Sequence, residues 1–264
     1  MQKINFTKIV ASGNDFVISE LKAPTAKLKG LAKKVCDRKY GIGADGLLVL
    51  EKSRVAEVKM RIFNPDGSEA QMCGNGARST ALYLKSRKVK IETKAGIIES
   101  EVNGDSVKIK LTEPSGVKLN LPIQVNQRTL RVNFINTGVP HTVIFAADLD
   151  KIDVVNLGRQ IRYHKKFAPR GTNVYFVEIL DNNFIKIRTY ERGVEDETLA
   201  CGTGAVAAAL LSAIRYPLSA RKRLNILTKS GEVLRVYFNR EDNKFKNVWL
   251  EGKAKIVFKG EFVS

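Results

Sequence analysis

The alternation of apolar and polar side chains predicts strands in this chain of 264 residues. Four segments place apolar residues at every second position, as a strand with one buried face does: 58–63 (VKMRIF), 107–111 (VKIKL), 185–190 (IKIRTY) and 233–238 (VLRVYF). Helices are predicted at 27–38, 77–86 and 205–214, and the last two are rich in Ala and Leu and lack Pro and Gly. We therefore expect an α+β fold of mostly antiparallel sheet, with one central helix in each half.

The chain also repeats itself, which indicates two homologous halves. The motif CGNGA at 73–77 returns as CGTGA at 201–205, which is 128 positions later. Four further pairs follow the same order at shifts between 125 and 135: 58–64 with 185–191, 93–96 with 228–231, 43–49 with 171–177, and 12–18 with 137–144. Because 113–127 holds two prolines, a glycine and no clear period, we place the boundary there. The expected domains are 1–118 with Cys73 and 119–264 with Cys201, leaving open whether the last strand packs back on the N-terminal half.

Composition limits the class of protein. With 44% hydrophobic residues the chain is not disordered, and its longest apolar stretch, 205–214, is too short to span a bilayer. The start shows no secretory signal, and three cysteines are too few for a disulfide framework, so we expect a cytoplasmic protein with reduced thiols. The 45 Lys and Arg exceed the 27 Asp and Glu, a net charge of +18, but they are spread out. The densest runs, 85–90 and 221–223, carry no nucleic-acid-binding motif, so we expect no nucleic-acid or membrane partner.

The two repeated cysteines carry the candidate chemistry. Each precedes Gly-x-Gly where a strand turns into a helix, so Cys73 and Cys201 are expected at helix N-termini. A thiol there has a lowered pKa, and the free N–H groups can hold a carboxylate. Two such elements would present two thiols across one cleft, as inversion at a carbon requires: one removes a proton while the other delivers one to the opposite face. The alternative is that each is a small buried hydrophobe, which is our interpretation of the unrepeated Cys36.

Other chemistries find less support in the residue pattern. The cysteines and the two histidines do not have metal-ligand spacing, and no lysine stands out as a Schiff-base residue. Arg192 could bind a carboxylate through two parallel hydrogen bonds from its planar guanidinium. Asn14, Asn64 and Asn173 could bind an amino-acid group, although Asn beside Gly is more often turn chemistry. His141 follows Pro140 and is, from the residues alone, as readily a turn or core histidine as a functional one.

Two longer motifs now make a resemblance specific. NPDGSEAQMCGNGARS at 64–79 and ERGVEDETLACGTGA at 191–205 resemble the two signatures of the diaminopimelate epimerase family. SGNDF, GIGADG, GVPH and RGTNV fit the same family, and the resemblance runs from about residue 6 to 260. Asn75 in CGNG separates the chain from proline racemases, which carry His there.

The resemblance implies two pseudosymmetric halves, each a mostly antiparallel sheet around a central helix, and no pyridoxal phosphate or metal. It implies an isomerase that interconverts LL- and meso-2,6-diaminoheptanedioate for lysine and peptidoglycan synthesis, and a homodimer. Cys73 would be proton donor and Cys201 proton acceptor from LL to meso, with His141 and Glu191 tuning the transfer. The implied substrate contacts are Asn14, Asn64, Gly74, Asn75, Asn173, Glu191, Arg192, Gly202 and Thr203.

Two departures leave the substrate open. Some family members carry Gln at the position of Gly46 and Asn at that of Val139, and both side-chain contacts are missing here. A racemase of lysine or histidine on the same scaffold is therefore the main alternative. A non-catalytic relative is a second, against which the retention of both cysteines and Glu191 argues. A cysteine hydrolase would leave the second cysteine without a role.

Overall fold

The computed structural model describes residues 3–216, 223–241 and 244–263 and divides the chain into two compact units. Unit 1 comprises Met1–Lys110 and Glu251–Ser264, and unit 2 comprises Leu111–Leu250. The last strand, β17 (Lys244–Val263), begins in unit 2 and supplies the final strand of unit 1. Of the basic run 221–223, residues 221 and 222 lie outside the described residues.

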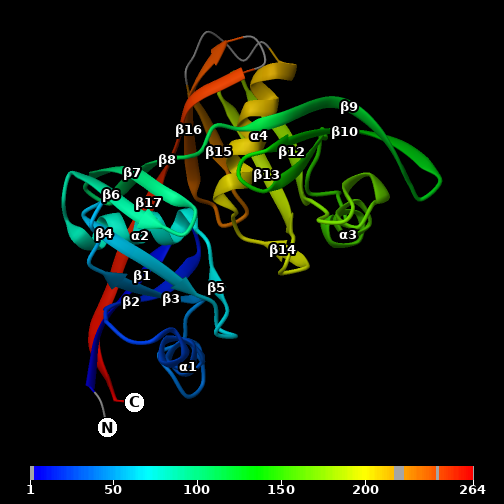
Figure 1. Ribbon diagram of the computed structural model, residues 1–264. Helices are drawn as coiled ribbons and strands as arrows, with labels where there is room; N and C mark the ends of the chain where they lie inside the picture. The colour runs from blue at the N-terminus through cyan, green and yellow to red at the C-terminus, as the bar shows by residue number, and fades with distance from the viewer. Residues whose placement is uncertain (1–2, 217–222, 242–243, 264) are drawn as a thin grey trace. The chain divides into compact units, whose positions relative to one another are not determined.

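Unit 1 is a closed ring of strands around a helix (Figure 1). Within the described residues the ring runs β1–β2–β3–β4–β6–β7–β8–β17 and returns to β1, with parallel pairs only at β2–β3 and β4–β6. The bounds are β1 Lys3–Ala11, β2 Asn14–Glu20, β3 Gly46–Glu51, β4 Val58–Phe63, β6 Lys88–Thr93, β7 Gly96–Asn103 and β8 Ser106–Lys110, and β5 (Glu69–Ala70) pairs with β4. Helix α2 (Gly74–Leu84) fills the ring, and α1 (Thr25–Cys36) covers β3 and β4 from outside.

Unit 2 has the same order of pairings around a second buried helix. Strands β9 to β13 pair in sequence order, β13 then pairs with β14 and, in parallel, with β15, and β15 pairs with β16. Their bounds are β9 Ser115–Val125, β10 Arg128–Asn136, β11 Pro140–Phe145, β12 Asn173–Asp181, β13 Phe184–Glu191, β14 Asp196–Thr198, β15 Arg223–Leu227 and β16 Val233–Glu241. Helix α4 (Gly202–Arg215) is buried from Gly204 to Ala213, while α3 (Val154–Arg162) and the short 3₁₀ helix η1 (Lys165–Phe167) lie outside.

The registers of the two units confirm the internal duplication. The parallel pairs β2–β3 and β4–β6 of unit 1 correspond to β11–β12 and β13–β15 of unit 2. Leu48 pairs with Ile62, and Tyr175 pairs with Thr189, at a constant shift of 127 positions. Leu48 and Tyr175 therefore occupy equivalent places on the strand that faces the central helix. The fold class predicted from the sequence, α+β with a central helix in each half, is confirmed.

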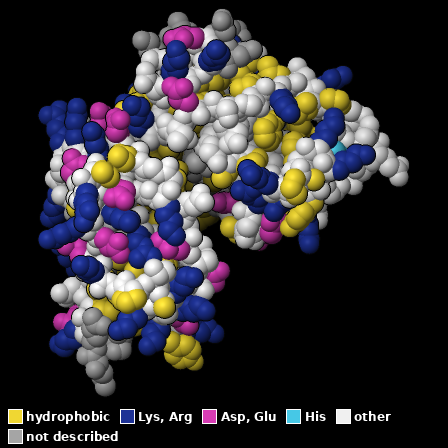
Figure 2. Space-filling model, in the orientation of Figure 1, with side chains coloured by type: hydrophobic (Ala, Val, Ile, Leu, Met, Phe, Trp, Pro, Cys, Tyr) yellow, Lys and Arg dark blue, Asp and Glu magenta, His cyan; other side chains and the backbone are white. Residues whose placement is uncertain are grey.

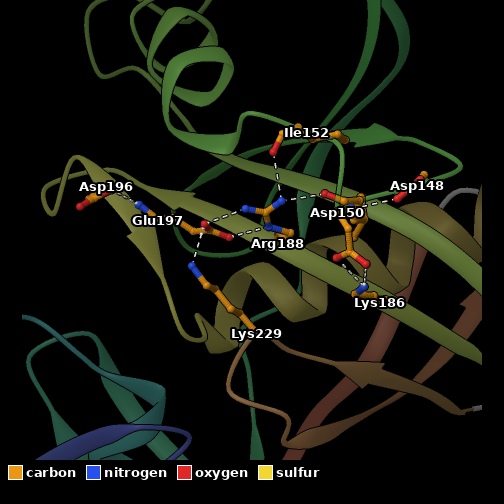
Figure 3. A network of polar contacts seen from close by, with 9 residues as sticks. Asp148, Asp150, Ile152, Lys186, Arg188, Asp196, Glu197 and Lys229 are labelled. Atoms are coloured by element: carbon orange, nitrogen blue, oxygen red, sulfur yellow. Dashed lines mark hydrogen bonds and ion pairs between the residues drawn. The ribbon is translucent and has the colours of Figure 1, made fainter.

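An ionic cluster around a shielded carboxylate repeats in both units and fixes the short strand that leads toward each cysteine. In unit 1, Arg61 and Lys94 both contact Glu69 of β5, at 2.8 and 2.7 Å. In unit 2, Arg188 and Lys229 contact Glu197 of β14, at 2.7 and 2.8 Å (Figure 3).

Arg188 extends the cluster to the segment before α3. Its guanidinium also donates to the carbonyl oxygens of Leu149 and Ile152, at 2.7 and 3.0 Å (Figure 3). The buried carboxylate of Glu197 is stabilised because its ionised form accepts hydrogen bonds from two cations. Strand β14 is thus held firmly just before Cys201.

Most predicted elements appear where the hydrophobic pattern placed them. VKMRIF coincides with β4, IKIRTY lies in β13, and the three predicted helices are α1, α2 and α4. The segment chosen as the boundary, 113–127, contains strand β9, which the pattern missed because most of its side chains are exposed and give no alternation. Cys36, expected in a core or on a helix face, is buried among apolar residues at the end of α1.

The surface carries its positive charge in dispersed form. On the visible face of each unit, Lys and Arg side chains are interspersed with Asp and Glu (Figure 2). Among the described residues, no helix has the length and apolar character that crossing a bilayer requires.

Candidate functional site

Cys73 caps helix α2 of unit 1 as the sequence predicts. Its backbone is extended (φ −143°, ψ 124°), and its Sγ accepts a hydrogen bond from the Gly76 N–H at 3.4 Å. A side chain at Gly76 would crowd the Leu48 Cδ2 at 3.2 Å, so the first turn of α2 is closely packed on apolar side chains. The half-buried thiol therefore lies where unpaired helix N–H groups favour a negative charge.

Two of the predicted substrate contacts in unit 1 belong to one buried polar chain. Arg78, which is fully buried, donates to Asn75 Oδ1 and to Ser12 Oγ, both at 2.6 Å. Asn75 in turn donates to Asn14 Oδ1 at 2.5 Å, and Asn14 donates to Asp45 at 3.2 Å. The tight turn at 12–13, where both residues have positive φ, delivers Asn14 to this chain. Asn14 and Asn75 are thus brought together beside the start of α2 and oriented by protein groups.

Asn64 lies apart from this chain. It is exposed in the turn between β4 and β5, where its side chain donates to Ser68 Oγ at 2.9 Å and its backbone bonds Ser68 and Gly67. These contacts match the turn chemistry that the sequence left open for it. Gly74, the other predicted contact, is half-buried as the first residue of α2.

The surroundings of Gly46 bear on the departure from the family pattern at this position, where some members carry a glutamine. A side chain there would meet the Phe63 carbonyl oxygen at 3.2 Å and the Phe16 ring at 3.3 Å. Phe16 is the strand partner of Gly46. The packing of this chain therefore leaves little room for a glutamine at position 46.

Cys201 caps helix α4 of unit 2 with a similar extended backbone (φ −129°, ψ 116°). Its Sγ lies 3.6 Å from Thr203 Oγ1. The expectation that a helix N-terminus lowers the thiol pKa is wrong here: burial and the nearby Glu191 charge raise the pKa of Cys201 to about 12. The Tyr175 hydroxyl, the Thr203 hydroxyl and the Gly204 N–H act in the lowering direction, but desolvation outweighs them.

Glu191 is the last residue of β13 and Arg192 follows it, and both are half-buried. The Thr198 hydroxyl donates to Glu191 Oε2 at 2.9 Å, yet burial raises the pKa of Glu191. Asn173 fixes the backbone of Arg192, because its Oδ1 accepts from the Arg192 N–H at 2.9 Å. The Asn173 Nδ2 donates to the Pro140 carbonyl at 3.1 Å. Asn173 thus positions both the 140–141 segment and the Arg192 backbone.

His141 is completely buried on β11, where it pairs with Asn173 of the parallel strand β12. Neither ring nitrogen has a hydrogen-bond partner among the described residues, and desolvation together with the Arg192 charge lowers the pKa of His141 to about 3. Its ring lies edge-on to that of Tyr175, with 5.3 Å between the two ring centroids. The imidazole is therefore neutral at pH 7.

Unit 2 brings most of its predicted residues together: Cys201, Gly202 and Thr203 at the start of α4, and Glu191, Arg192, Asn173 and His141 on the adjoining strands and turns. Tyr175 belongs to the same group and was missed, because GTNVYFV has the pattern of an ordinary buried strand. Among residues 3–216, 223–241 and 244–263, no cluster of three His, Cys, Asp or Glu could hold a metal ion.

Comparison with known proteins agrees with these motifs. The family described as "Diaminopimelate epimerase" matches residues 6–117 and 133–257. A diaminopimelate epimerase of Aquifex aeolicus is 43% identical, covering 97% of this chain and 97% of its own, and one of Hydrogenobaculum sp. is 40% identical, covering 96% of each. Among solved structures, a PhzF-family phenazine biosynthesis protein of Bacillus anthracis aligns over 100% of both chains with a TM-score of 0.74 at 19% identity, which shows the shared fold.

Proposed function

Because the chain belongs to the diaminopimelate epimerase family and is an isomerase of lysine biosynthesis, we propose that it converts LL-2,6-diaminoheptanedioate to the meso form. The observation that carries the proposal is the repeated cysteine cap. Cys73 and Cys201 occupy the same place in two duplicated units, each at the N-terminus of the central helix. Inversion at a carbon by two-base catalysis needs one group that removes the proton and one that delivers a proton, and the duplicated cysteines supply both.

From LL to meso, the Cys201 thiolate removes the Cα proton and the Cys73 thiol delivers a proton to the opposite face. The reverse reaction exchanges the two roles. An amino-acid Cα proton is a very weak acid, so a base of high proton affinity is needed to remove it. Burial and the Glu191 charge give Cys201 that affinity, since they raise its pKa to about 12. Cys201 is then a strong base once ionised.

The negative charge that develops on the substrate requires donors. The N–H groups of Gly202 and Thr203 begin α4, and those of Gly74 and Asn75 begin α2, so they suit a carboxylate. Arg192 has five N–H donors, of which one reaches the Arg170 carbonyl at 3.2 Å, and it is a candidate partner for a substrate carboxylate.

The remaining predicted residues would hold and shape the site. Glu191 acts on Cys201 through its charge, and neutral His141 is available as a hydrogen-bond donor or acceptor. Asn14 and Asn173 are already oriented by protein groups. Each amide nitrogen carries two hydrogens, and one of them is donated to a protein acceptor, Asp45 for Asn14 and the Pro140 carbonyl for Asn173. Asn64 is the weakest candidate, since it is exposed and bonded within its own turn.

Lysine or histidine racemisation is the competing activity, because Gly46 and Val139 lack the side chains that some relatives use. Both activities share the chemistry at Cα and differ in the distal group that is recognised. The crowding at Gly46 favours neither substrate, and a glutamine there would require small shifts of Phe16 and of the Phe63 carbonyl.

The decisive experiment follows the α-proton by NMR in D₂O with reduced enzyme, LL-diaminopimelate and no added cofactor. Lysine and histidine are run in parallel, and Cys36→Ala serves as a control because Cys36 is buried in the α1 core. We expect proton wash-out with meso product from diaminopimelate alone. Exchange on lysine or histidine alone would transfer the function to a racemase, and no exchange on any substrate would refute the proposed chemistry.

Two further points belong to the proposal. The enzyme acts in the cytoplasm, where thiols used as acids and bases stay reduced. It also associates as a homodimer, as the family resemblance suggests, and light scattering at working concentration tests this directly. A mass of one chain, 29.3 kDa, would contradict it.

A further inference from the structure

Tyr175 lies against the first turn of α4 and is fully buried. A Cβ atom added to Gly204 would lie 1.7 Å from its Cζ and 1.9 Å from its hydroxyl oxygen. Gly204 is the third residue of the helix that Cys201 caps, and its N–H acts to lower the pKa of the Cys201 thiol. Because Gly204 has no side chain, the Tyr175 phenol can pack against the end of α4 that Cys201 caps.

The Tyr175 hydroxyl makes no well-aligned hydrogen bond among the described residues, yet it lies close enough to Cys201 to act on that thiol as a hydrogen-bond donor. A buried hydroxyl without a well-aligned acceptor is destabilising, so a nearby group that can accept from it is favoured. Burial and the neighbouring Cys201 and Glu191 raise the pKa of Tyr175, so it keeps its proton and serves as a donor.

The titratable groups around this hydroxyl narrow the choice of acceptor. The Tyr175 hydroxyl makes no hydrogen bond to Glu191, and neither nitrogen of His141, whose ring meets that of Tyr175 edge-on, has a partner among the described residues. The hydroxyl does act on Cys201, where it works to lower the pKa of the thiol. A neutral thiol is a weak acceptor, whereas a thiolate is a strong one. Cys201 in its ionised form is the group that gains most from the buried O–H.

Resting on the proposed role of Cys201 as proton acceptor, we propose that Tyr175 is a positioning residue for that role. Its hydroxyl donates a hydrogen bond to the Cys201 thiolate, which stabilises the charge and aims the sulfur lone pair. When the thiolate takes the Cα proton, the bond weakens and the phenol keeps its own proton. The equivalent place in unit 1 is Leu48, so the device belongs to one cysteine only.

The test measures the thiolate itself, without substrate. Tyr175→Phe keeps the ring and removes the donor, so the pKa of Cys201 should rise by about one to two units. The rate of iodoacetamide alkylation at fixed pH, followed by peptide mass spectrometry, should fall about 3- to 15-fold at Cys201, since higher nucleophilicity offsets part of the loss. Cys73 in the same molecules should alkylate at an unchanged rate.

Tyr190→Phe is the matched control, because Tyr190 is also fully buried in unit 2 and its hydroxyl donates to Glu195. Incorporation of 3-fluorotyrosine at 175 keeps size and hydroxyl but strengthens the donor, so Cys201 alkylation should become faster. An unchanged Cys201 rate in Tyr175→Phe, or an equal fall in Tyr190→Phe, would overturn the inference.

A kinetic readout separates this inference from the proposed function. In Cys73→Ser, exchange of the LL α-proton in D₂O reports Cys201 alone, and adding Tyr175→Phe should move the acid limb of this exchange to higher pH. In Cys201→Ser, exchange of the meso α-proton reports Cys73 alone, and Tyr175→Phe should leave its acid limb in place. Slower Cys201 alkylation together with exchange of the meso isomer rather than the LL isomer in Cys73→Ser would uphold the role of Tyr175 and refute the assignment of the two thiols.

Discussion

The two cysteine caps share a backbone and differ in what surrounds them. At Cys73 the side chains that flank the motif glycines are apolar, with Ile109 against Gly74 and Leu48 against Gly76. At Cys201 the equivalent of Leu48 is Tyr175, and His141 and Glu191 lie close by. Duplication thus supplied two thiols of one kind, and later divergence adjusted the electrostatics of one of them. An epimerase whose two substrates are not mirror images has no need of two identical bases.

The polar groups beside each helix differ in the same way. Asn75 on α2 belongs to a buried chain with Arg78 and Asn14. The equivalent residue on α4, Thr203, contacts the thiol with its hydroxyl and accepts from the Thr137 hydroxyl at its carbonyl, at 3.0 Å. The side chain of Asn75, the second residue of α2, therefore bonds other protein side chains, whereas that of Thr203, the second residue of α4, contacts the Cys201 sulfur.

The largest expected effect tests whether the caps act as partners. Cys73→Ser and Cys201→Ser should each lower epimerisation about 100- to 10,000-fold, because a hydroxyl is a far weaker acid than a thiol. In D₂O, Cys73→Ser should still exchange the α-proton of the LL isomer through Cys201, and Cys201→Ser that of the meso isomer. NMR of each isomer checks this one-sided exchange. Retention of most activity in either variant, relative to Cys36→Ala, would contradict the two-thiol mechanism.

The glycines that follow the cysteines give the next largest effect. Gly204→Ala drives a methyl into the Tyr175 ring and should lower the free energy of unfolding by about 3 kcal/mol. Gly76→Ala meets only the flexible end of Leu48 at 3.2 Å, and should change it by less than about 1 kcal/mol. Urea unfolding measures both.

A double variant sharpens this result. Tyr175→Leu copies the side chain that unit 1 uses and should recover most of the loss when combined with Gly204→Ala. Equal losses at Gly204 and Gly76, or strict additivity of the Gly204 and Tyr175 changes, would show that the two caps are packed alike.

The sequence predicted the parts of this comparison that repeat. CGNGA and CGTGA place both cysteines at helix starts, and VKMRIF and IKIRTY give the strands that precede them. It could not predict the contrast, because Tyr175 lies in a run of buried residues whose facing depends on strand register. The raised pKa of Cys201 escaped it for a related reason: motif geometry reports the helix terminus, while burial and the Glu191 charge arise from the tertiary fold.

The smallest effect concerns His141 in unit 2. Around the corresponding glycines of unit 1, Gly74 and Gly76, the neighbouring side chains of the described residues include no second histidine and no carboxylic acid. Its folded-state pKa of about 3 lies below the usual 6.5, so the folded state resists protonating it. The stability it contributes is complete above pH 6.5 and is lost as the pH falls from there toward 3. Between pH 7 and pH 5 this costs about 2 kcal/mol. His141→Gln should remove that part of the slope, whatever it does to stability at pH 7. His164→Gln, which changes the half-buried histidine that precedes η1, should leave most of the slope. Unfolding free energies at the two pH values decide, and an unchanged slope in His141→Gln would mean that His141 is protonated in the folded enzyme.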